Sequence, residues 1–285
     1  MSPDICGKVY TAASGFAYGS DGRPCMLAPM TQASTVPMIW AESGGRGSPT
    51  LLLLHGLGGH AGVWQRLLPL VVARWPGRWV APDLRGHGRS NNAACYSFGA
   101  HAADVAALLA PREEVAVLGH SMGGAVAMTL ASGWFGVVVR RVFAFGVKLV
   151  WTEAEIGRAR ALARAPARWF ATRAEALERH LLVAGLKGLV DPDDTLAAPG
   201  VVEEGGRFRL AADPGINDVV GVDIARVAGA MTAPLHLAAG ERDPMVSLAE
   251  MQRFDAGAQA LPGVGHNPHV EAPEALWRIA ERALL

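Results

Sequence analysis

The chain has 285 residues, of which 51% are hydrophobic and 18% are charged. This composition can bury a large core, so we expect an ordered globular chain. Its 26 basic and 26 acidic residues cancel to a formal net charge of zero, which gives no electrostatic reason to bind nucleic acid or an anionic membrane surface. No apolar run reaches the roughly 18 residues that a membrane span needs.

The three cysteines, Cys6, Cys25 and Cys95, are odd in number and far apart. They form no CxxC pair, so we expect neither a disulfide framework nor a zinc site, and a reducing cytoplasm is the plain interpretation. His55 and His60 do not suggest a metal site either, because their spacing fits no common ligand pattern. We therefore expect no metal and no cofactor.

The first 37 residues differ in character from the rest. They are rich in Ser, Thr, Gly and Pro, and their apolar residues follow no sustained period. They lack a basic segment followed by an apolar one, so they do not resemble a signal peptide. We predict a flexible tail over 1–37. The alternatives are an extra edge strand near Gly7–Tyr18, or a translation start at Met30 or Met38.

Strand-like and helix-like segments alternate from Met38 to residue 147. After the short segment MIWAES, buried strands are predicted where apolar runs end in glycine or a loop: TLLLLHG, RWVAP, EVAVLGH and RRVFAFGV. Helical spacing of apolar residues lies between them. This alternation predicts a mostly parallel sheet with helices on both faces, and residues 38–147 form the first part of this core.

The alternation is interrupted over residues 148–230 and resumes over 231–285, with the strand PLHLAAG and the closing helix PEALWRIAERALL. An insertion of this length predicts a cap, or lid, over the carboxyl edge of the sheet. Its first part has the spacing of two amphipathic helices broken near Pro166. The bulkiest apolar pair there, Trp169 and Phe170, is predicted to line a substrate pocket.

The segment GHSMG, Gly119 to Gly123, lies between a predicted buried strand and a predicted helix. This context is typical of a nucleophile elbow, in which a sharp turn projects Ser121 upward. The residues two before and two after the serine nearly touch, so glycine is needed at both positions. The following helix directs its N-terminal dipole toward an oxyanion formed beside Ser121.

A serine nucleophile needs a base that is oriented by an acid, and in a sheet of this kind the chain order is Ser, Asp or Glu, His. Asp243 follows the strand after the insertion, and His266 lies in a glycine-flanked loop after the last short strand. We predict Ser121, Asp243 and His266 as the catalytic residues. His269 is the alternative base, although we expect it to be a surface or supporting residue. Glu153 is a weaker alternative acid.

The oxyanion hole needs two main-chain N–H donors. We predict Met122, directly after the serine, and Leu57, in the loop HGLGGH after the first long strand. Asp83 and Arg85, in DLRGHGRS, are predicted to organise the loop that contains them. Glu241 is predicted to be solvated.

Five segments together resemble the α/β-hydrolase superfamily: LLLLHGLGGHAGVW, DLRGHGRS, LGHSMGG, AGERDPMV and GVGHNPHVEAPE. The resemblance covers residues 38–285, with the cap matching in position only. It is greatest to compact capped members: carboxylesterases, enol-lactone hydrolases, C–C bond hydrolases and cofactor-free perhydrolases. It implies an α/β-hydrolase fold with a helical cap inserted after the sixth family strand. Epoxide hydrolases and haloalkane dehalogenases of this superfamily carry Asp where this chain has Ser121, which argues against both.

These observations predict a serine hydrolase that cleaves a small, largely apolar ester or lactone through an acyl-serine intermediate. C–C bond hydrolysis, thioester hydrolysis or acyl transfer on the same triad, and non-catalytic binding of a small molecule, remain alternatives. The expected partner is the small-molecule substrate, with no nucleic acid or membrane, and the oligomeric state is open. A preference for anionic substrates would instead assign specificity to the cap arginines, which are Arg158, Arg160, Arg164, Arg168 and Arg173.

Overall fold

The computed structural model describes residues 16–18, 24–26 and 38–285. The chain divides into two compact units, 1–36 and 37–285. In the first unit, β1 (Phe16–Tyr18) pairs antiparallel with β2 (Pro24–Met26) in a sheet of their own. The remainder of the predicted tail, and most of the alternative strand near Gly7–Tyr18, lie outside the described residues.

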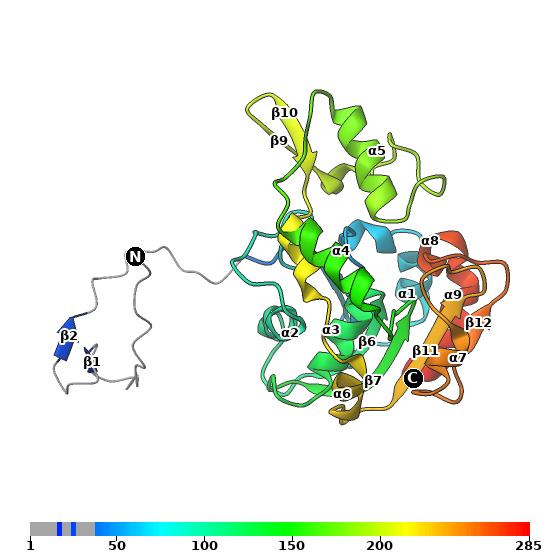
Figure 1. Ribbon diagram of the computed structural model, residues 1–285. Coiled ribbons are helices and arrows are strands. Elements are labelled where there is room, and N and C mark those ends of the chain that lie inside the picture. The colour runs from blue at the N-terminus through cyan, green and yellow to red at the C-terminus, as the bar shows by residue number, and fades with distance from the viewer. Residues whose placement is uncertain (1–15, 19–23, 27–37) are drawn as a thin grey trace. The chain divides into compact units, whose positions relative to one another are not determined.

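The second unit is built on a seven-stranded sheet with the order β12-β11-β7-β6-β4-β5-β3 (Figure 1). Neighbouring strands are parallel, except that β3 runs antiparallel to β5 at one edge. The strands are β3 (Ala41–Gly44), β4 (Thr50–Leu54), β5 (Trp79–Pro82), β6 (Glu114–His120), β7 (Val138–Phe145), β11 (Leu235–Gly240) and β12 (Gln259–Leu261).

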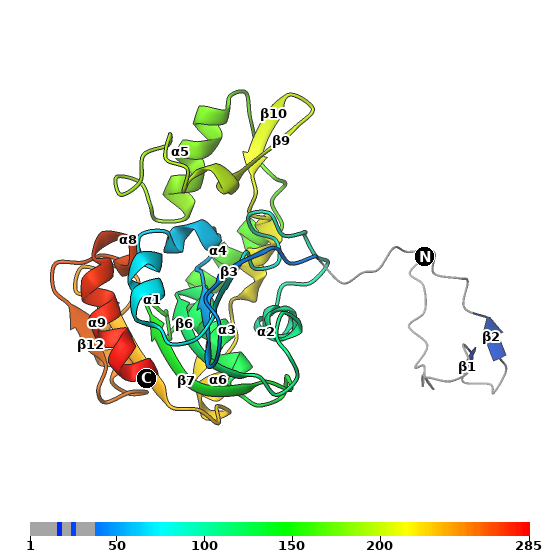
Figure 2. The same ribbon diagram turned by 180° about the vertical axis from the view of Figure 1, so that it is seen from behind.

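Both faces of this sheet are buried under helices, as the continuous apolar runs predict. In β4, Leu51 and Leu53 belong to one core cluster, whereas Leu52 and Leu54 belong to the other, because successive side chains of a strand point to opposite faces. Helices α1 and α9 contribute to the first cluster, and α2, α3, α6 and α7 contribute to the second; Figure 2 shows the side of α1 and α9. The core helices are α1 (Leu68–Arg74), α2 (Phe98–Ala107), α3 (Met122–Leu130), α6 (Ile224–Gly229), α7 (Leu248–Met251), α8 (Pro268–Glu271) and α9 (Pro273–Leu284), with the 3₁₀ helix η1 (Ala61–Trp64). None of the helices in the described ranges has the length and hydropathy to cross a membrane.

The insertion leaves the sheet after β7 and returns at β11, and these two strands are neighbours in the sheet. Figures 1 and 2 both show α5, β9 and β10 gathered beyond one end of the sheet. The inserted elements are α4 (Glu153–Ala163), β8 (Trp169–Phe170), α5 (Arg173–Val183), η2 (Ala198–Gly200), β9 (Val201–Glu204), β10 (Arg207–Leu210) and η3 (Pro214–Val219). Helix α6 also lies between β7 and β11 in the chain, but it packs against α3 of the core. The two predicted helices are α4 and α5.

The insertion is not wholly helical, which corrects the predicted helical cap. Strands β8, β10 and β9 form a small antiparallel sheet in that order. Gly205 and Gly206, both with positive φ, connect β9 to β10. A two-residue Gly-Gly loop suits a tight hairpin because glycine adopts positive φ without steric cost. This Gly-Gly pair is a hairpin signal that the prediction of a helical cap did not include.

Candidate active site

Ser121 lies in a strained turn between β6 and α3. Its backbone has φ 50° and ψ −116°, a conformation that side-chain-bearing residues rarely adopt. A Cβ at Gly119 would lie 2.7 Å from the carbonyl oxygen of Gly123, and a Cβ at Gly123 would lie 2.1 Å from that of Leu54. The turn therefore requires glycine on both sides of the serine, as the motif predicts.

Asp243 and His266 are joined by a hydrogen bond of 2.7 Å between Oδ2 and Nδ1. The Asp243 side chain is fully buried, and its other oxygen accepts the main-chain N–H of Met245 at 2.8 Å. Because a buried carboxylate accepts hydrogen bonds, Nδ1 of His266 carries the proton and Nε2 is free to accept one. Ser121 and His266 both line one pocket, so the structure brings together the three residues that the sequence singled out.

The loop that carries His266 is restrained on both sides. The carboxylate of Glu271 accepts the N–H groups of Gly265, at 2.7 Å, and Asn267, at 3.0 Å. Nε2 of His120 lies 2.9 Å from the carbonyl oxygen of His266 and donates to it. Neither restraint was predicted from the sequence. Glu271 lies only five residues from His266, but nothing in the sequence marks its side chain as turning back onto the loop.

His269 is a poor alternative base. Its side chain is fully buried and lies against the rings of Trp64, at 4.9 Å between centroids, and His120, at 4.6 Å. Burial lowers the pKa of His269 to about 3 and holds that of His120 well below its usual range. Both rings are therefore neutral beside His266. Of the two roles predicted for His269, the surface position is wrong, because α8 packs against η1 and buries the side chain. Its contact with His120, which donates to the His266 carbonyl, fits the supporting role.

The loop after β4 abuts the turn at Ser121. A Cβ at Gly56 would lie 3.1 Å from the Cβ of Ser121 and 2.8 Å from Nδ1 of His120, so only glycine permits this approach. The ring of His55 fixes the loop, because Nδ1 donates to the carbonyl oxygen of Gly56 at 2.8 Å and Nε2 accepts the N–H of Leu84 at 2.9 Å.

Leu57 directly follows Gly56 and Met122 directly follows Ser121, and both residues line the pocket. Met122 is the first residue of α3, and the first N–H groups of a helix have no acceptor within it. The main-chain N–H groups of Leu57 and Met122 therefore remain the predicted donors of an oxyanion hole beside Ser121.

Asp83 and Arg85 hold loops together, as predicted. The oxygens of Asp83 accept the N–H of Ala61 at 2.6 Å and the N–H and Nε of Arg89, both at 2.8 Å. Burial alone would raise the pKa of Asp83, but these hydrogen bonds outweigh it and lower the pKa. Arg85 makes a two-pronged contact with Asp104 at 2.5 and 2.7 Å.

The remaining alternative acids lie away from this centre. Glu241 is exposed and accepts the N–H of Gly263 at 2.8 Å. Glu153 is exposed in the first turn of α4. Asp243, by contrast, is hydrogen-bonded to Nδ1 of His266, so it is the acid that contacts the base.

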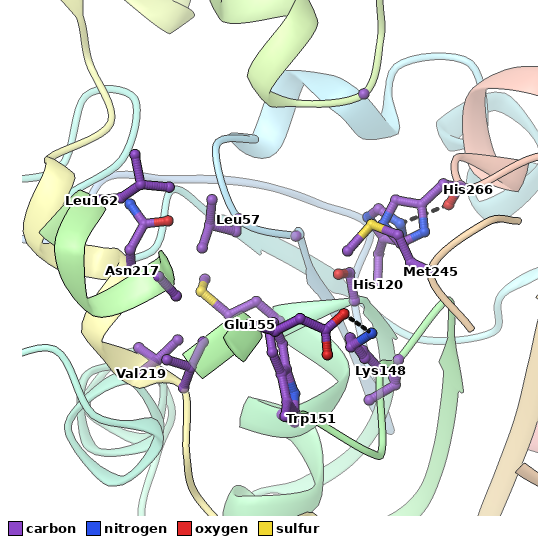
Figure 3. Close-up of a pocket in the computed structure, with 18 of the residues that line it drawn as sticks. Leu57, His120, Lys148, Trp151, Glu155, Leu162, Asn217, Val219, Met245 and His266 are labelled. Carbon is purple, nitrogen blue, oxygen red and sulfur yellow. Dashed lines mark hydrogen bonds and ion pairs between the residues drawn. The ribbon is translucent and has the colours of Figure 1, made fainter. Parts of the chain in front are cut away.

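The pocket beside Ser121 has a volume of about 440 Å³ and lies between the core and the insertion. Figure 3 shows Leu57, Met245 and His266 from the core facing Trp151, Leu162 and Val219 from the insertion. Its lining is mainly apolar. Apart from Ser121, His120 and His266, the polar side chains in it are Lys148, Glu155, Arg158 and Asn217. This volume is within the usual range for small-molecule sites.

Trp169 and Phe170 do not line this pocket, which corrects the prediction made from their bulk. They form β8, where Trp169 pairs with Arg209 and Phe170 pairs with Phe208. Phe170 is buried, and the Trp169 ring lies beside the guanidinium groups of Arg207, at 5.5 Å, and Arg209, at 5.9 Å. Their pairing in the small sheet draws both side chains away from Ser121.

Two curated relatives match the chain over a limited segment. Lipase LipV of Mycobacterium tuberculosis is 43% identical over 94 residues, which are 31% of this chain and 34% of that protein. The magnesium-chelatase 30 kDa subunit of Rhodobacter capsulatus is 40% identical over 101 residues, or 33% and 35% of the two chains. The match thus spans about a third of the length of these relatives.

Solved structures match over nearly the whole chain. The thioesterase domain from the curacin biosynthetic pathway has a TM-score of 0.67 at 21% identity and covers 98% of this chain and 100% of that one. The E-2-(acetamidomethylene)succinate hydrolase has a TM-score of 0.69 at 24% identity, with 86% and 95% covered. At these identities the similarity establishes the fold. The sequence profile described as the alpha/beta hydrolase family matches residues 51–279, and the chain belongs to this family.

Proposed function

We propose that this protein is a serine hydrolase that cleaves a small, largely apolar ester or lactone through an acyl-serine intermediate. The observation that carries the proposal is that Ser121, in its strained turn, shares a pocket with His266, whose Nδ1 is hydrogen-bonded to the buried carboxylate of Asp243. Nucleophile, base and orienting acid are the three parts of a catalytic triad.

The geometry supports a two-step reaction. Oγ of Ser121 attacks the carbonyl carbon while Nε2 of His266 accepts the hydroxyl proton. The main-chain N–H groups of Leu57 and Met122 stabilise the oxyanion. The C–O bond to the alcohol then breaks, and the alcohol leaves with the proton from His266. Water, deprotonated by His266, releases the acid and restores Ser121, while Asp243 stabilises the imidazolium in both steps.

The pocket supports the substrate class. Its volume of about 440 Å³ and its mainly apolar walls suit short to medium acyl chains or a small lactone ring. Each methylene that the pocket buries contributes up to about 0.8 kcal/mol. Catalytic efficiency should therefore rise with acyl length to a maximum and then fall when the chain exceeds the pocket.

The test is a panel of 4-nitrophenyl esters of increasing acyl length, together with lactones, thioesters and a C–C bond substrate. We expect turnover of esters or lactones that disappears in Ser121→Ala and in His266→Ala. His236→Ala is the matched control, because His236 lies in β11 and does not line the pocket. Ester turnover that survives Ser121→Ala would overturn the proposal. If only the thioester or only the C–C bond substrate is cleaved, that bond, and not an oxygen ester, is the one that the enzyme hydrolyses.

A further inference from the structure

An ion pair lies in the wall of this mainly apolar pocket. Nζ of Lys148 is 2.8 Å from Oε1 of Glu155, and the two side chains are 18% and 29% exposed. Lys148 follows β7 by three residues, and Glu155 lies in the first turn of α4. Figure 3 shows the pair inside the pocket, near His120. Nothing in the proposed ester chemistry uses it.

The two partners differ in what they can still offer to a ligand. Oε1 of Glu155 accepts from Lys148, and Oε2 accepts from the N–H and the hydroxyl of Thr152, both at 2.9 Å. The hydrogen bond from Lys148, followed by those from Thr152, lowers the pKa of Glu155 to about 2. The carboxylate is therefore ionised with both oxygens engaged. The ammonium of Lys148 has three N–H donors and gives one to Glu155.

The charged residues that line the pocket also favour an anionic ligand. Arg158, on α4 three residues after Glu155, also lines the pocket. Among the lining residues, which all belong to the described part of the chain, Glu155 is the one carboxylate, whereas Lys148 and Arg158 are two cations. The lining thus carries surplus positive charge and unused N–H donors, which favour a ligand with an anionic acceptor group.

The cation shares the pocket with the reacting residues, because Lys148, Ser121 and His266 all line it. Glu155 does have a structural role, because it is the N3 residue of the Thr152 capping box that begins α4, but a capping box needs no partner such as Lys148.

We infer that the preferred substrate is an ester that carries a carboxylate, which Lys148 and Arg158 bind while the apolar walls hold the hydrocarbon part. This inference rests on the proposed function and names the class of its substrate. Removing the charge-assisted hydrogen bond between Lys148 and this carboxylate should lower the preference for the anionic over the neutral ester by roughly tenfold.

The experiment compares matched esters. In the first series, the carboxylate is on the acyl chain: the substrates are the mono-4-nitrophenyl esters of the dicarboxylic acids from succinic to suberic acid. Each is compared with the neutral ester in which an isopropyl group replaces the free carboxylate. On the alcohol side, 4-carboxyphenyl hexanoate is set beside 4-isopropylphenyl hexanoate. The readout is the ratio of kcat/KM for the anionic ester to kcat/KM for its neutral partner. The same pairs are also titrated into Ser121→Ala to measure binding without turnover.

We expect wild type to favour the carboxylate in one of the two series. Lys148→Met should lower that ratio about tenfold, Arg158→Gln should lower it less, and Glu155→Gln should raise it because it frees the ammonium. Arg164→Gln, at the C-cap of the same helix but outside the pocket lining, should leave the ratio unchanged. A structural role alone would slow both members of each pair equally.

The two proposals fail in different ways. If neutral esters are cleaved through Ser121 but no ratio responds to Lys148→Met or Glu155→Gln, the carboxylate inference is wrong and the proposed function stands. If no ester is cleaved, the proposed function fails, and the binding series still decides the inference. Equal affinity of Ser121→Ala for both members of every pair would overturn it.

Discussion

The strain at Ser121 makes a prediction about stability that is separate from activity. A residue with a side chain held at φ 50° and ψ −116° stores about 1–3 kcal/mol of backbone strain. Glycine would relieve this strain, but it costs about 0.5–1 kcal/mol because the unfolded chain gains freedom. We therefore expect Ser121→Gly to be more stable than Ser121→Ala by about 1 kcal/mol, because alanine keeps the strain. For a chain of this size that difference corresponds to about 2 °C in Tm.

The assay is thermal unfolding of the two inactive variants side by side, monitored by circular dichroism. Comparing the variants with each other removes the contribution of the lost hydroxyl group, since both lack it. If Ser121→Gly unfolds at a lower temperature than Ser121→Ala, by the amount that an ordinary alanine-to-glycine change costs, the turn is not strained and the elbow geometry is wrong.

Three further predictions concern the acid, a buried histidine and the pocket wall. Asp243→Asn should lower kcat by about 10⁴, since the amide favours the wrong tautomer of the base; steady-state kinetics that show less than a tenfold loss would contradict this role. Burial lowers the pKa of His180 to about 4, whereas the pKa of an unfolded histidine is about 6.5. The stability that this neutral ring allows is therefore fully present above about pH 6.5, and it falls below that pH because the unfolded chain takes up a proton that the folded chain does not. Between pH 7 and pH 5, wild type should therefore lose about 2 kcal/mol more unfolding free energy than His180→Leu. Chemical denaturation at the two pH values measures this difference, and equal losses would be inconsistent with a neutral buried ring. Leu162→Ala should lower kcat/KM for the longest accepted acyl chain about fourfold per lost methylene contact, while Trp169→Ala should leave the chain-length profile unchanged; a shifted profile in Trp169→Ala would return that residue to the pocket.

The core of the fold could be predicted because its signals are local. A strand such as Leu51–Leu54, with every side chain buried, must be covered on both faces, and the sequence shows this as a continuous apolar run. The turn at Ser121 is equally local, because its two glycines are dictated by contacts within a few residues. Asp243 and His266 could be found because the carboxyl ends of parallel strands meet at one edge of the sheet.

The pocket could not be predicted in the same way, because its walls come from segments whose mutual packing is not encoded by period or spacing. Trp169 and Phe170 are bulky, but two residues carry no periodic signal that would place them in a strand. Lys148 and Glu155 read as ordinary exposed charges until the chain brings them to the pocket. The histidine at position 120 reads as part of a motif, although its contact with His266 spans 146 residues of sequence.

The most direct test of the central claim, that Ser121 is an activated nucleophile, is intact-protein mass spectrometry after treatment with a fluorophosphonate. Such a reagent phosphonylates a serine that a neighbouring base activates. We expect a single adduct on the wild-type protein, mapped to Ser121 by peptide sequencing, absent from Ser121→Ala and strongly reduced in His266→Ala. An unmodified wild-type protein, or an adduct that persists in Ser121→Ala, would contradict the account.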